Sequence, residues 1–306
     1  MTKTAFLFAG QGAQYLGMAR DLYEQYDVVK ATFEEASQVL GYDVRALIDQ
    51  DEEKLNQTRY TQPAILTTSV AIYRLLAEKG IRPDMVAGLS LGEYSALVAA
   101  GALDFKTAVA LVAKRGAFME EAAPAGSGKM VAVLNADVAL IEETCHTASQ
   151  LGVVSPANYN TPGQIVIGGD VAAVDRAVEL LKEAGVKRLI PLNVSGPFHT
   201  ALLKPASEKL AQVLAETEFT EFQLPLVGNT EADIMEASRI KELLTRQIIE
   251  PVRFYDSIAK MQEAGVTEFI EIGPGKVLSG FMKKIDKSAI VHSVESVETL
   301  TALLEK

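Results

Sequence analysis

The sequence predicts an α/β protein whose parallel sheet carries helices on both faces and is interrupted by a second, smaller unit. Short apolar runs that end near glycine alternate with longer helical stretches along most of the 306 residues, an order typical of parallel sheets. From about residue 128 to residue 198 the order changes to strand, helix, strand, strand, helix, strand. This β-α-β-β-α-β order is the ferredoxin-like pattern, so we expect an inserted subdomain.

Glycine and proline mark the ends of the elements expected in the first 127 residues. An apolar run at residues 4–9 precedes a glycine-rich segment, which predicts a buried strand and a tight loop. Pro63 and Gly80 bracket a helical stretch, because proline is favoured at the first position of a helix and glycine just past its last. The other elements expected here are a strand at residues 84–88, a helix at 92–101, and a helix from the N-cap Asp104 to about residue 121.

The insert and the C-terminal part continue the two patterns. A segment of small residues and glycine at 124–128 marks the transition into the insert. Within the insert we expect strands at 130–134, 153–158, 164–168 and 188–193, and helices at 138–149 and 171–184. After residue 200 we expect helices at 202–216, 239–249 and 254–264, another from 276 and a last one at the C-terminus, with strands at 224–227, 268–272 and 289–291.

The composition limits the compartment and the partners. Asp and Glu number 40 against 29 Lys and Arg, and the net charge of −11 argues against a nucleic acid partner. Cys145 is the only cysteine, which excludes an intrachain disulfide, fits a reducing cytoplasm and argues against a zinc site. No apolar run approaches the roughly 20 residues of a membrane helix. We therefore expect a cytoplasmic protein with no membrane partner, no metal and no cofactor. We take it to be a monomer, a state that the composition does not determine.

The strongest chemical signal is the segment Gly88-Leu89-Ser90-Leu91-Gly92. A strand is expected to end at Gly88 and a helix to begin near Gly92, so the chain must turn sharply at Ser90. Such a turn places the hydroxyl at the carboxyl end of a strand and above a helix N-terminus, as a nucleophile requires. The alternative is an ordinary strand-to-helix turn with a capping serine. We favour the nucleophile.

Three histidines could supply the base that this serine needs. His146 lies among polar neighbours on an expected helix, and nothing distinguishes His292 in the last short strand. His199 follows the last strand of the insert, where the chain returns to the core, and that boundary is a natural cleft edge. By elimination we expect His199 to be the base, with a purely structural histidine as the alternative.

Acyl chemistry also needs hydrogen-bond donors for an oxyanion. The N–H of Leu91 is one candidate, because it belongs to the residue after the nucleophile. The N–H of Gln11 is the second, since the glycines on either side let this amide point into a site. An ordinary β-α turn at Gln11 remains an equal alternative.

Arg115 falls on the apolar face of its helix, whereas Lys114 points away from that face. A buried arginine needs a partner, because an unpaired buried charge is very unfavourable. The partner is either a structural Glu or Asp, or the carboxylate of a substrate held by two hydrogen bonds. The pattern favours neither.

Together these residues stand in motifs that resemble the malonyl-CoA:acyl carrier protein transacylases of fatty acid synthesis and the related acyltransferase domains of polyketide and animal fatty acid synthases. The resemblance covers essentially the whole chain. Its motifs are Phe8-Ala-Gly-Gln-Gly-Ala-Gln14, Thr61-Gln-Pro63, Gly88-Leu-Ser-Leu-Gly-Glu-Tyr-Ser-Ala-Leu97, Arg115-Gly116, Asn158-Tyr-Asn-Thr-Pro-Gly-Gln164, Pro197-Phe-His199, Gln247 before Pro251-Val252, and Glu271-Ile-Gly-Pro-Gly275. Many members have histidine where this chain has Leu89.

The resemblance implies a role for each candidate residue. These roles are Ser90 as nucleophile, His199 as base, Gln247 as the residue whose backbone carbonyl orients the histidine in place of an acid, Gln11 and Leu91 as oxyanion donors, Arg115 as the group that binds the malonyl carboxylate, and Phe198 as the bulk that disfavours an α-methyl branch.

The resemblance also implies a fold and a reaction. It implies an α/β-hydrolase-like core at residues 1–127 and 199–306 with the ferredoxin-like insert at 128–198. The implied enzyme transfers malonyl from malonyl-CoA to the phosphopantetheine thiol of acyl carrier protein through a malonyl-serine. The partners are then acyl carrier protein and malonyl-CoA or CoA, and Lys187-Arg188 and Lys283-Lys284 are candidate docking residues or plain surface charge. A serine esterase or thioesterase with an acid in its triad, and a non-catalytic carrier-binding module, are the competing hypotheses.

Overall fold

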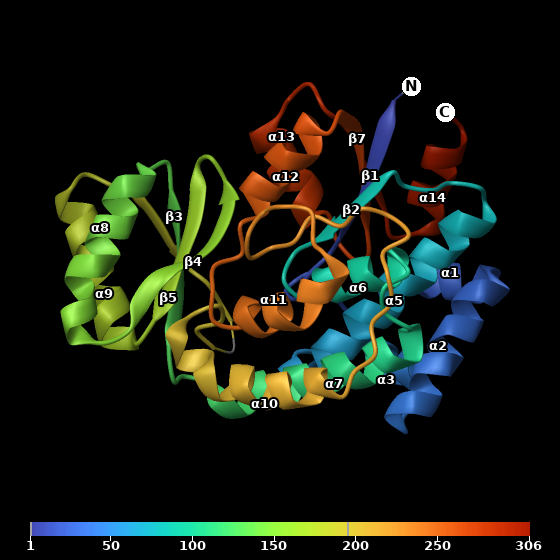
Figure 1. Cartoon of the computed structure of the whole chain (residues 1–306), viewed down its shortest axis with the longest axis horizontal. Coiled ribbons are helices and arrows are strands. Elements are labelled where there is room, and N and C mark those ends of the chain that lie inside the picture. The colour runs from blue at the N-terminus through green and yellow to red at the C-terminus, as the bar shows by residue number, and fades with distance from the viewer. Residues whose placement is uncertain (1, 195) are drawn as a thin grey trace.

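Two separate sheets organise the computed structural model, which describes residues 2–194 and 196–306 (Figure 1). The first sheet has the order β2-β1-β7-β8 and is parallel throughout; its strands are β1 (Lys3–Phe8), β2 (Met85–Gly88), β7 (Val266–Ile272) and β8 (Ile290–Val294). The second has the order β4-β5-β3-β6 and is antiparallel; its strands are β3 (Lys129–Leu134), β4 (Val154–Thr161), β5 (Gln164–Gly169) and β6 (Arg188–Pro191). The predicted fold class is confirmed.

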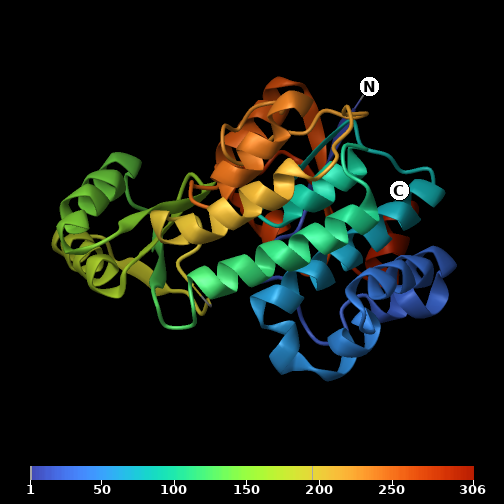
Figure 2. The same ribbon diagram turned by 60° about the horizontal axis from the view of Figure 1, so that its bottom comes forward.

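Helices surround both sheets. They are α1 (Arg20–Gln25), α2 (Asp27–Leu40), α3 (Val44–Gln50), α4 (Glu52–Leu55), α5 (Thr58–Glu78), α6 (Gly92–Ala99), α7 (Phe105–Ala122), α8 (Val138–Ala148), α9 (Val171–Glu183), α10 (Lys204–Ala215), α11 (Ile240–Gln247), α12 (Phe254–Glu263), α13 (Val277–Ile285) and α14 (Val297–Leu304). Figure 2 shows α7 and α10 lying side by side. Within the described part of the chain, none of the helices combines the length and the apolar character that crossing a membrane would need.

The parallel sheet is the middle layer of three. Successive side chains of a strand point to opposite faces. Accordingly, Phe6 and Phe8 of β1 pack in one apolar cluster with α2, α5, α6 and α7, whereas Ala5 and Leu7 pack in another with α12 and α13. Because both faces are buried, the carboxyl ends of the strands are where polar side chains can gather.

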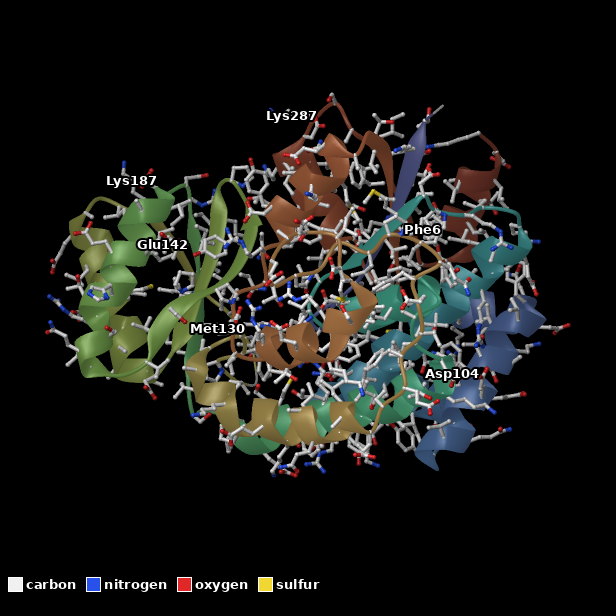
Figure 3. All side chains as sticks on the ribbon, in the orientation of Figure 1. Phe6, Asp104, Met130, Glu142, Lys187 and Lys287 are labelled. Carbon is white, nitrogen blue, oxygen red and sulfur yellow. The ribbon has the colours of Figure 1, made fainter. Side chains whose placement is uncertain are left out.

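The second sheet uses its two faces differently. Val131 and Val133 of β3 pack against α8 and α9, which cover its outer face (Figure 1). Met130 and Ala132, on the other face, join the main cluster around Phe6; Figure 3 labels Met130 and Phe6. The elements follow the predicted order β-α-β-β-α-β. The boundaries at residues 127/128 and 198/199 stay a prediction.

The helix that was expected to begin at Pro63 begins earlier. It starts at Thr58, and Pro63 lies inside it. The expectation was wrong because the first turn is fixed by packing: Gly116 of α7 lies so close that a Cβ there would come 2.6 Å from the Thr58 carbonyl oxygen. Tertiary contact therefore extends the helix past the position that proline favours.

The strand expected at residues 224–227 is also incomplete. The segment forms only an isolated parallel bridge between Leu226 and Val86, beside β2, and an antiparallel bridge between Val227 and Ile234. Pro225 explains the short pairing, because proline has no N–H to give to a ladder. Its carbonyl still accepts from the Val86 N–H at 3.0 Å.

Candidate active site

The predicted sharp turn is present between β2 and α6, and Ser90 lies at its apex. Ser90 has a left-handed backbone with φ 54°. The flanking glycines are required by close approach: a Cβ at Gly88 would lie 2.0 Å from the Gly92 backbone, and a Cβ at Gly92 would lie 2.1 Å from the Phe8 carbonyl oxygen. The turn therefore holds the serine at the carboxyl end of the parallel sheet, as the motif predicts.

His199 lies against this serine. Its Nε2 is 2.8 Å from Ser90 Oγ, and its Nδ1 is 2.7 Å from the backbone oxygen of Gln247. Because a carbonyl oxygen only accepts, Nδ1 carries the proton and Nε2 is the acceptor for the serine hydroxyl. Burial, and after it the positive charge of Arg115, lowers the pKa of His199 to about 4. The imidazole is therefore neutral at pH 7 and able to accept a proton.

Arg115 is buried beside the serine and is held by amide oxygens. Its Nη1 donates to Gln62 Oε1 at 2.8 Å and its Nη2 to Gln247 Oε1 at 2.9 Å, with Ser90 Oγ 3.3 Å from Nη2. The guanidinium also lies 5.2 Å from the centre of the Tyr94 ring. Over residues 2–194 and 196–306, no carboxylate forms an ion pair with it. The sequence left two possible partners for Arg115, a structural Glu or Asp and a substrate carboxylate. Among the described residues, its hydrogen-bond partners are Gln62, Gln247 and Ser90, and none of them is an acid.

The two residues expected to supply oxyanion donors lie near Ser90 in the folded protein. Leu91 is buried, and Gln11 lines the cleft. In the described residues, neither backbone N–H has a hydrogen-bond acceptor within the protein. The Gln11 side chain is fixed, because its Nε2 donates to Thr58 Oγ1 at 3.1 Å and its Oε1 accepts from Gln62 at 3.4 Å. Both amides are thus available to a developing negative charge.

Gln11, Ser90 and His199 line a cleft of about 640 Å³ between the two sheets. A volume of this size suits a small ligand. The lining residues outside the range 128–198 include Gln11, Leu89, Ser90, His199, Val277 and Phe281. Those within that range include Met130, Asn158, Asn160, Gln164, Val166, Leu192 and Phe198. Phe198 lies in the wall of the cleft, and its role in selectivity stays a prediction.

The sequence did not identify three residues that complete the site. Gln62 holds Arg115, and the only signal for it was its place in a shared motif. Asn229 accepts from the Ser90 N–H at 2.7 Å, and Glu93 accepts from the Asn229 N–H at 2.7 Å. Glu93 is three residues from the serine, but a glutamate at a helix start is normally solvated. No local pattern marks Asn229.

The other two histidines and the cysteine lie outside the cleft. His292 on β8 has its Nε2 3.2 Å from Glu268 Oε1, and His146 is exposed on α8. Cys145 is buried on α8 in the core of the second sheet. Among the residues that the structure describes, no group of three or more His, Cys, Asp or Glu side chains is placed to hold a metal ion.

Comparison with known proteins agrees with this geometry. The acyl transferase domain family matches residues 5–303. The malonyl CoA-acyl carrier protein transacylase of Bacillus subtilis (strain 168) is 50% identical over 100% of this chain and 97% of its own length. The crystal structure of MCAT from Streptococcus pneumoniae has a TM-score of 0.98 at 74% identity over 99% of both chains. The complex PlMCAT:AntF (holo), a type II PKS acyl-carrier protein with its malonyl-transacylase, contains a chain with a TM-score of 0.96 at 47% identity over 99% of both chains. The chain therefore belongs to the acyl transferase domain family, among the malonyl CoA-acyl carrier protein transacylases.

Proposed function

We propose that this protein transfers the malonyl group from malonyl-CoA to the phosphopantetheine thiol of acyl carrier protein and so supplies chain-extender units for fatty acid biosynthesis. One observation carries the choice of acyl group: the Arg115 guanidinium, held by neutral partners, lies 3.3 Å from Ser90 Oγ. A serine that reacts beside a fixed cation suits an acyl group that bears a carboxylate. The names of the relatives support the same donor and acceptor.

In the first half-reaction, neutral His199 takes the Ser90 proton at Nε2 while Oγ attacks the thioester carbonyl carbon. The carbonyl oxygen becomes an oxyanion that the N–H groups of Gln11 and Leu91 stabilise. When the intermediate collapses, the carbon–sulfur bond breaks and the proton on Nε2 passes to the departing CoA sulfur. The Gln247 carbonyl keeps the proton on Nδ1 throughout, because it accepts at 2.7 Å. The product is a malonyl ester of Ser90.

In the second half-reaction, the thiol of acyl carrier protein takes the place of CoA. Its proton goes to His199 Nε2 as the sulfur attacks the ester carbonyl. The same two N–H groups stabilise the second oxyanion, and the proton returns to Ser90 Oγ when the ester bond breaks. No metal or cofactor is needed for these steps, since the histidine supplies the proton transfers and the backbone supplies the oxyanion donors.

Selectivity follows from Arg115 and Phe198. Hydrogen bonds to a charged group contribute roughly 1.5–3 kcal/mol, which corresponds to roughly a ten- to hundredfold preference for an acyl group with a carboxylate. Gln62 and Gln247 fix the guanidinium, so the carboxylate it binds is placed relative to Ser90. Phe198 is buried in the cleft wall, where its ring would crowd a branch on the α-carbon.

A serine esterase is disfavoured by the partner of His199. An esterase triad places a carboxylate at Nδ1, but here a backbone carbonyl of Gln247 occupies that position. The hypothesis of a non-catalytic carrier-binding module is disfavoured by the 2.8 Å contact between Ser90 Oγ and His199 Nε2. A surface that only binds a carrier protein does not need this contact.

The carrier protein is expected to dock at the mouth of the cleft, and the enzyme to act as a cytoplasmic monomer. Val277 and Phe281 of α13 line the cleft, and Lys283 and Lys284 are exposed further along the same helix. Because it shares this helix with two cleft residues, we propose that lysine pair as the first candidate docking site. The exposed pair Lys187 and Arg188 is the second candidate.

The test is to incubate the protein with a mixture of acyl-CoAs and to map any adduct by mass spectrometry. We expect malonyl on the peptide that contains Ser90, no adduct in Ser90→Ala, and transfer to added holo acyl carrier protein. Ser95→Ala is the matched control. Ser95 is a buried serine of helix α6, which follows Ser90, and it takes no part in the hydrogen bond between Ser90 and His199. Release of free malonate without carrier protein, or an adduct that survives Ser90→Ala, would contradict the proposal.

A further inference from the structure

The side chain of Asn229 bridges the two sides of the turn at Ser90. Its Oδ1 accepts from the Ser90 N–H at 2.7 Å, and its Nδ2 donates to the Gly88 carbonyl oxygen at 2.6 Å. One partner is a donor and the other an acceptor, so the orientation of the amide is determined. Asn229 is fully buried, and its own backbone oxygen accepts from the Arg253 N–H at 2.9 Å.

This bridge acts on a strained residue. Ser90 has φ 54°, a region that costs a non-glycine residue on the order of 1–3 kcal/mol and persists only when the surroundings enforce it. Besides Asn229 at its N–H, Gln247 Nε2 donates to the Ser90 carbonyl oxygen at 3.0 Å. Both backbone polar groups of the nucleophile are therefore held by side chains from distant parts of the chain.

Glu93 joins the backbone of Asn229 to the side chain of Gln247. Its Oε1 accepts from the Asn229 N–H at 2.7 Å and its Oε2 from Gln247 Nε2 at 2.6 Å, and the residue is completely buried. Gln247 at the same time accepts from Arg115 and, through its backbone oxygen, from His199. One buried network thus connects the nucleophile, the base and the guanidinium.

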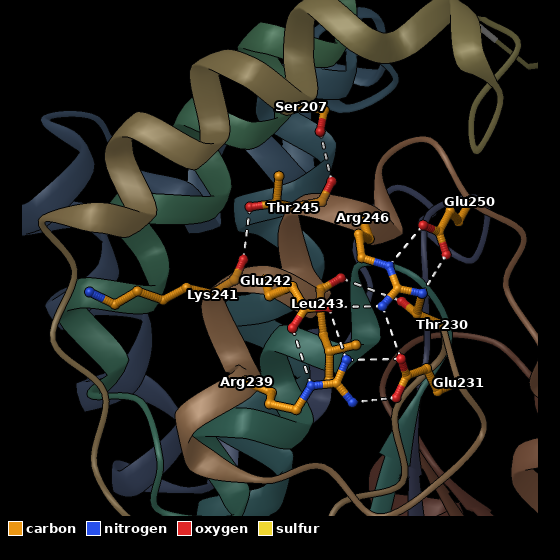
Figure 4. A network of polar contacts seen from close by, with 10 residues as sticks. All are labelled: Ser207, Thr230, Glu231, Arg239, Lys241, Glu242, Leu243, Thr245, Arg246 and Glu250. Carbon is orange, nitrogen blue, oxygen red and sulfur yellow. Dashed lines mark hydrogen bonds and ion pairs between the residues drawn. The ribbon is translucent and has the colours of Figure 1, made fainter.

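A second layer ties the loop after Asn229 to helix α11, which carries Gln247 (Figure 4). Arg246 forms ion pairs with Glu231 at 2.9 Å and with Glu250 at 2.8 Å. Thr230 Oγ1 also donates to the Leu243 carbonyl oxygen at 3.4 Å. Each exposed pair contributes little to stability alone, but together they restrict how far Asn229 and Gln247 can move apart.

We propose that Asn229 is a positioning residue that sets the geometry of Ser90 for attack. Glu93 fixes the positions of Asn229 and Gln247 relative to each other. The inference rests on the proposed role of Ser90 as nucleophile. Neither Asn229 nor Glu93 belongs to the cleft wall, so they act through Ser90 and Gln247 and not by touching substrate.

The first test is Asn229→Ala, measured by the single-turnover release of CoA from malonyl-CoA. We expect the acylation rate to fall by roughly ten- to a hundredfold, because small misplacements of a reacting group have effects of this size. KM should stay near the wild-type value, since Arg115 keeps its contacts. Ser257→Ala is the control: Ser257 is a buried serine whose hydroxyl donates to the neighbouring Gly228 oxygen at 3.1 Å, so it should lose stability without losing rate.

The second test is Asn229→Asp, which also serves if the alanine variant does not fold. A protonated aspartic acid reproduces both hydrogen bonds of asparagine, whereas the carboxylate repels the Gly88 oxygen. We therefore expect its acylation rate, relative to wild type, to rise as the pH is lowered from about 8 to 6. Folded Asn229→Ala with the wild-type rate, equal rate losses in Ser257→Ala, or an aspartate variant that follows the wild-type pH profile would overturn the proposal. Wild-type protein that forms no malonyl-serine would instead overturn the proposed function.

Discussion

Ser90 and His199 face each other at 2.8 Å, and both have left-handed backbones, with φ 54° and 58°. A non-glycine residue rarely adopts this conformation, and two such residues in direct contact mark a site where the fold enforces local strain. Hydrogen bonds fix both residues: the Ser90 backbone N–H donates to Asn229 Oδ1, and the imidazole of His199 donates from Nδ1 to the Gln247 carbonyl oxygen. The reacting pair is therefore preorganised by buried polar contacts.

Replacing Arg115 with alanine should change which acyl group is transferred. We expect kcat/KM for malonyl-CoA to fall by roughly ten- to a hundredfold, from the loss of a charge-assisted contact, while that for acetyl-CoA changes far less. Lys114→Ala is the control, since Lys114 is the exposed neighbour on the same helix. Equal losses for both substrates would show that Arg115 is structural.

Two glycine substitutions should have opposite effects on stability. Gly92→Ala would bring a Cβ to 2.1 Å from the Phe8 carbonyl oxygen, and backbone on both sides cannot yield, so we expect a large loss of melting temperature or no folded protein. Gly280→Ala in α13 meets nothing within 4 Å, so it should stabilise by about 1 kcal/mol through helix propensity. Thermal unfolding of the two variants checks both signs; a Gly92→Ala protein as stable as wild type would contradict the tight turn.

The rate of acylation should depend on the ionisation of His199. Its pKa, lowered to about 4 by burial and by Arg115, keeps the base neutral above that pH. We expect protonation of His199 to leave kcat/KM unchanged down to about pH 5 and to lower it as the pH approaches 4. In Arg115→Gln, measured with acetyl-CoA, the acid limb should move to higher pH because a neighbouring positive charge is gone. An unmoved limb would mean that burial alone sets this pKa.

Local pattern identified the turn at Ser90, the order of strands and helices, and His199 by elimination. It did not identify Asn229 or Glu93, because the contacts that define them join residues such as Ser90 and Asn229 that are 139 positions apart. Such contacts impose no period on the sequence. The partner of Arg115 stayed open for the same reason, since Gln62 reaches it from another helix. Packing against α7 likewise moved the start of α5 away from Pro63.

The free energy of unfolding should depend on pH through two buried groups, His199 and Glu93, whose effects have opposite signs. Burial lowers the pKa of His199 to about 4, below its ordinary 6.5, so the unfolded chain binds the extra proton and stability falls as the pH drops from 6.5 towards 4. Burial raises the pKa of Glu93 to about 7, above its ordinary 4.5, so the folded chain keeps the extra proton and stability falls as the pH rises from 4.5 towards 7. Each slope is at most about 1.4 kcal/mol per pH unit, and between pH 4.5 and 6.5 the two oppose each other.

Variants should separate these linkages. Glu93→Gln removes the Glu93 linkage and keeps that of His199, so its melting temperature should drop more steeply than that of wild type as the pH is lowered from 6.5 to 4.5. His199→Asn should show the opposite change, and asparagine is suited to this position because it tolerates the left-handed backbone at φ 58°. Thermal melts across this pH range give the slopes directly. If both variants kept the wild-type slope, neither buried group would have a displaced pKa in the folded protein, and the neutral base on which acylation depends would need another explanation.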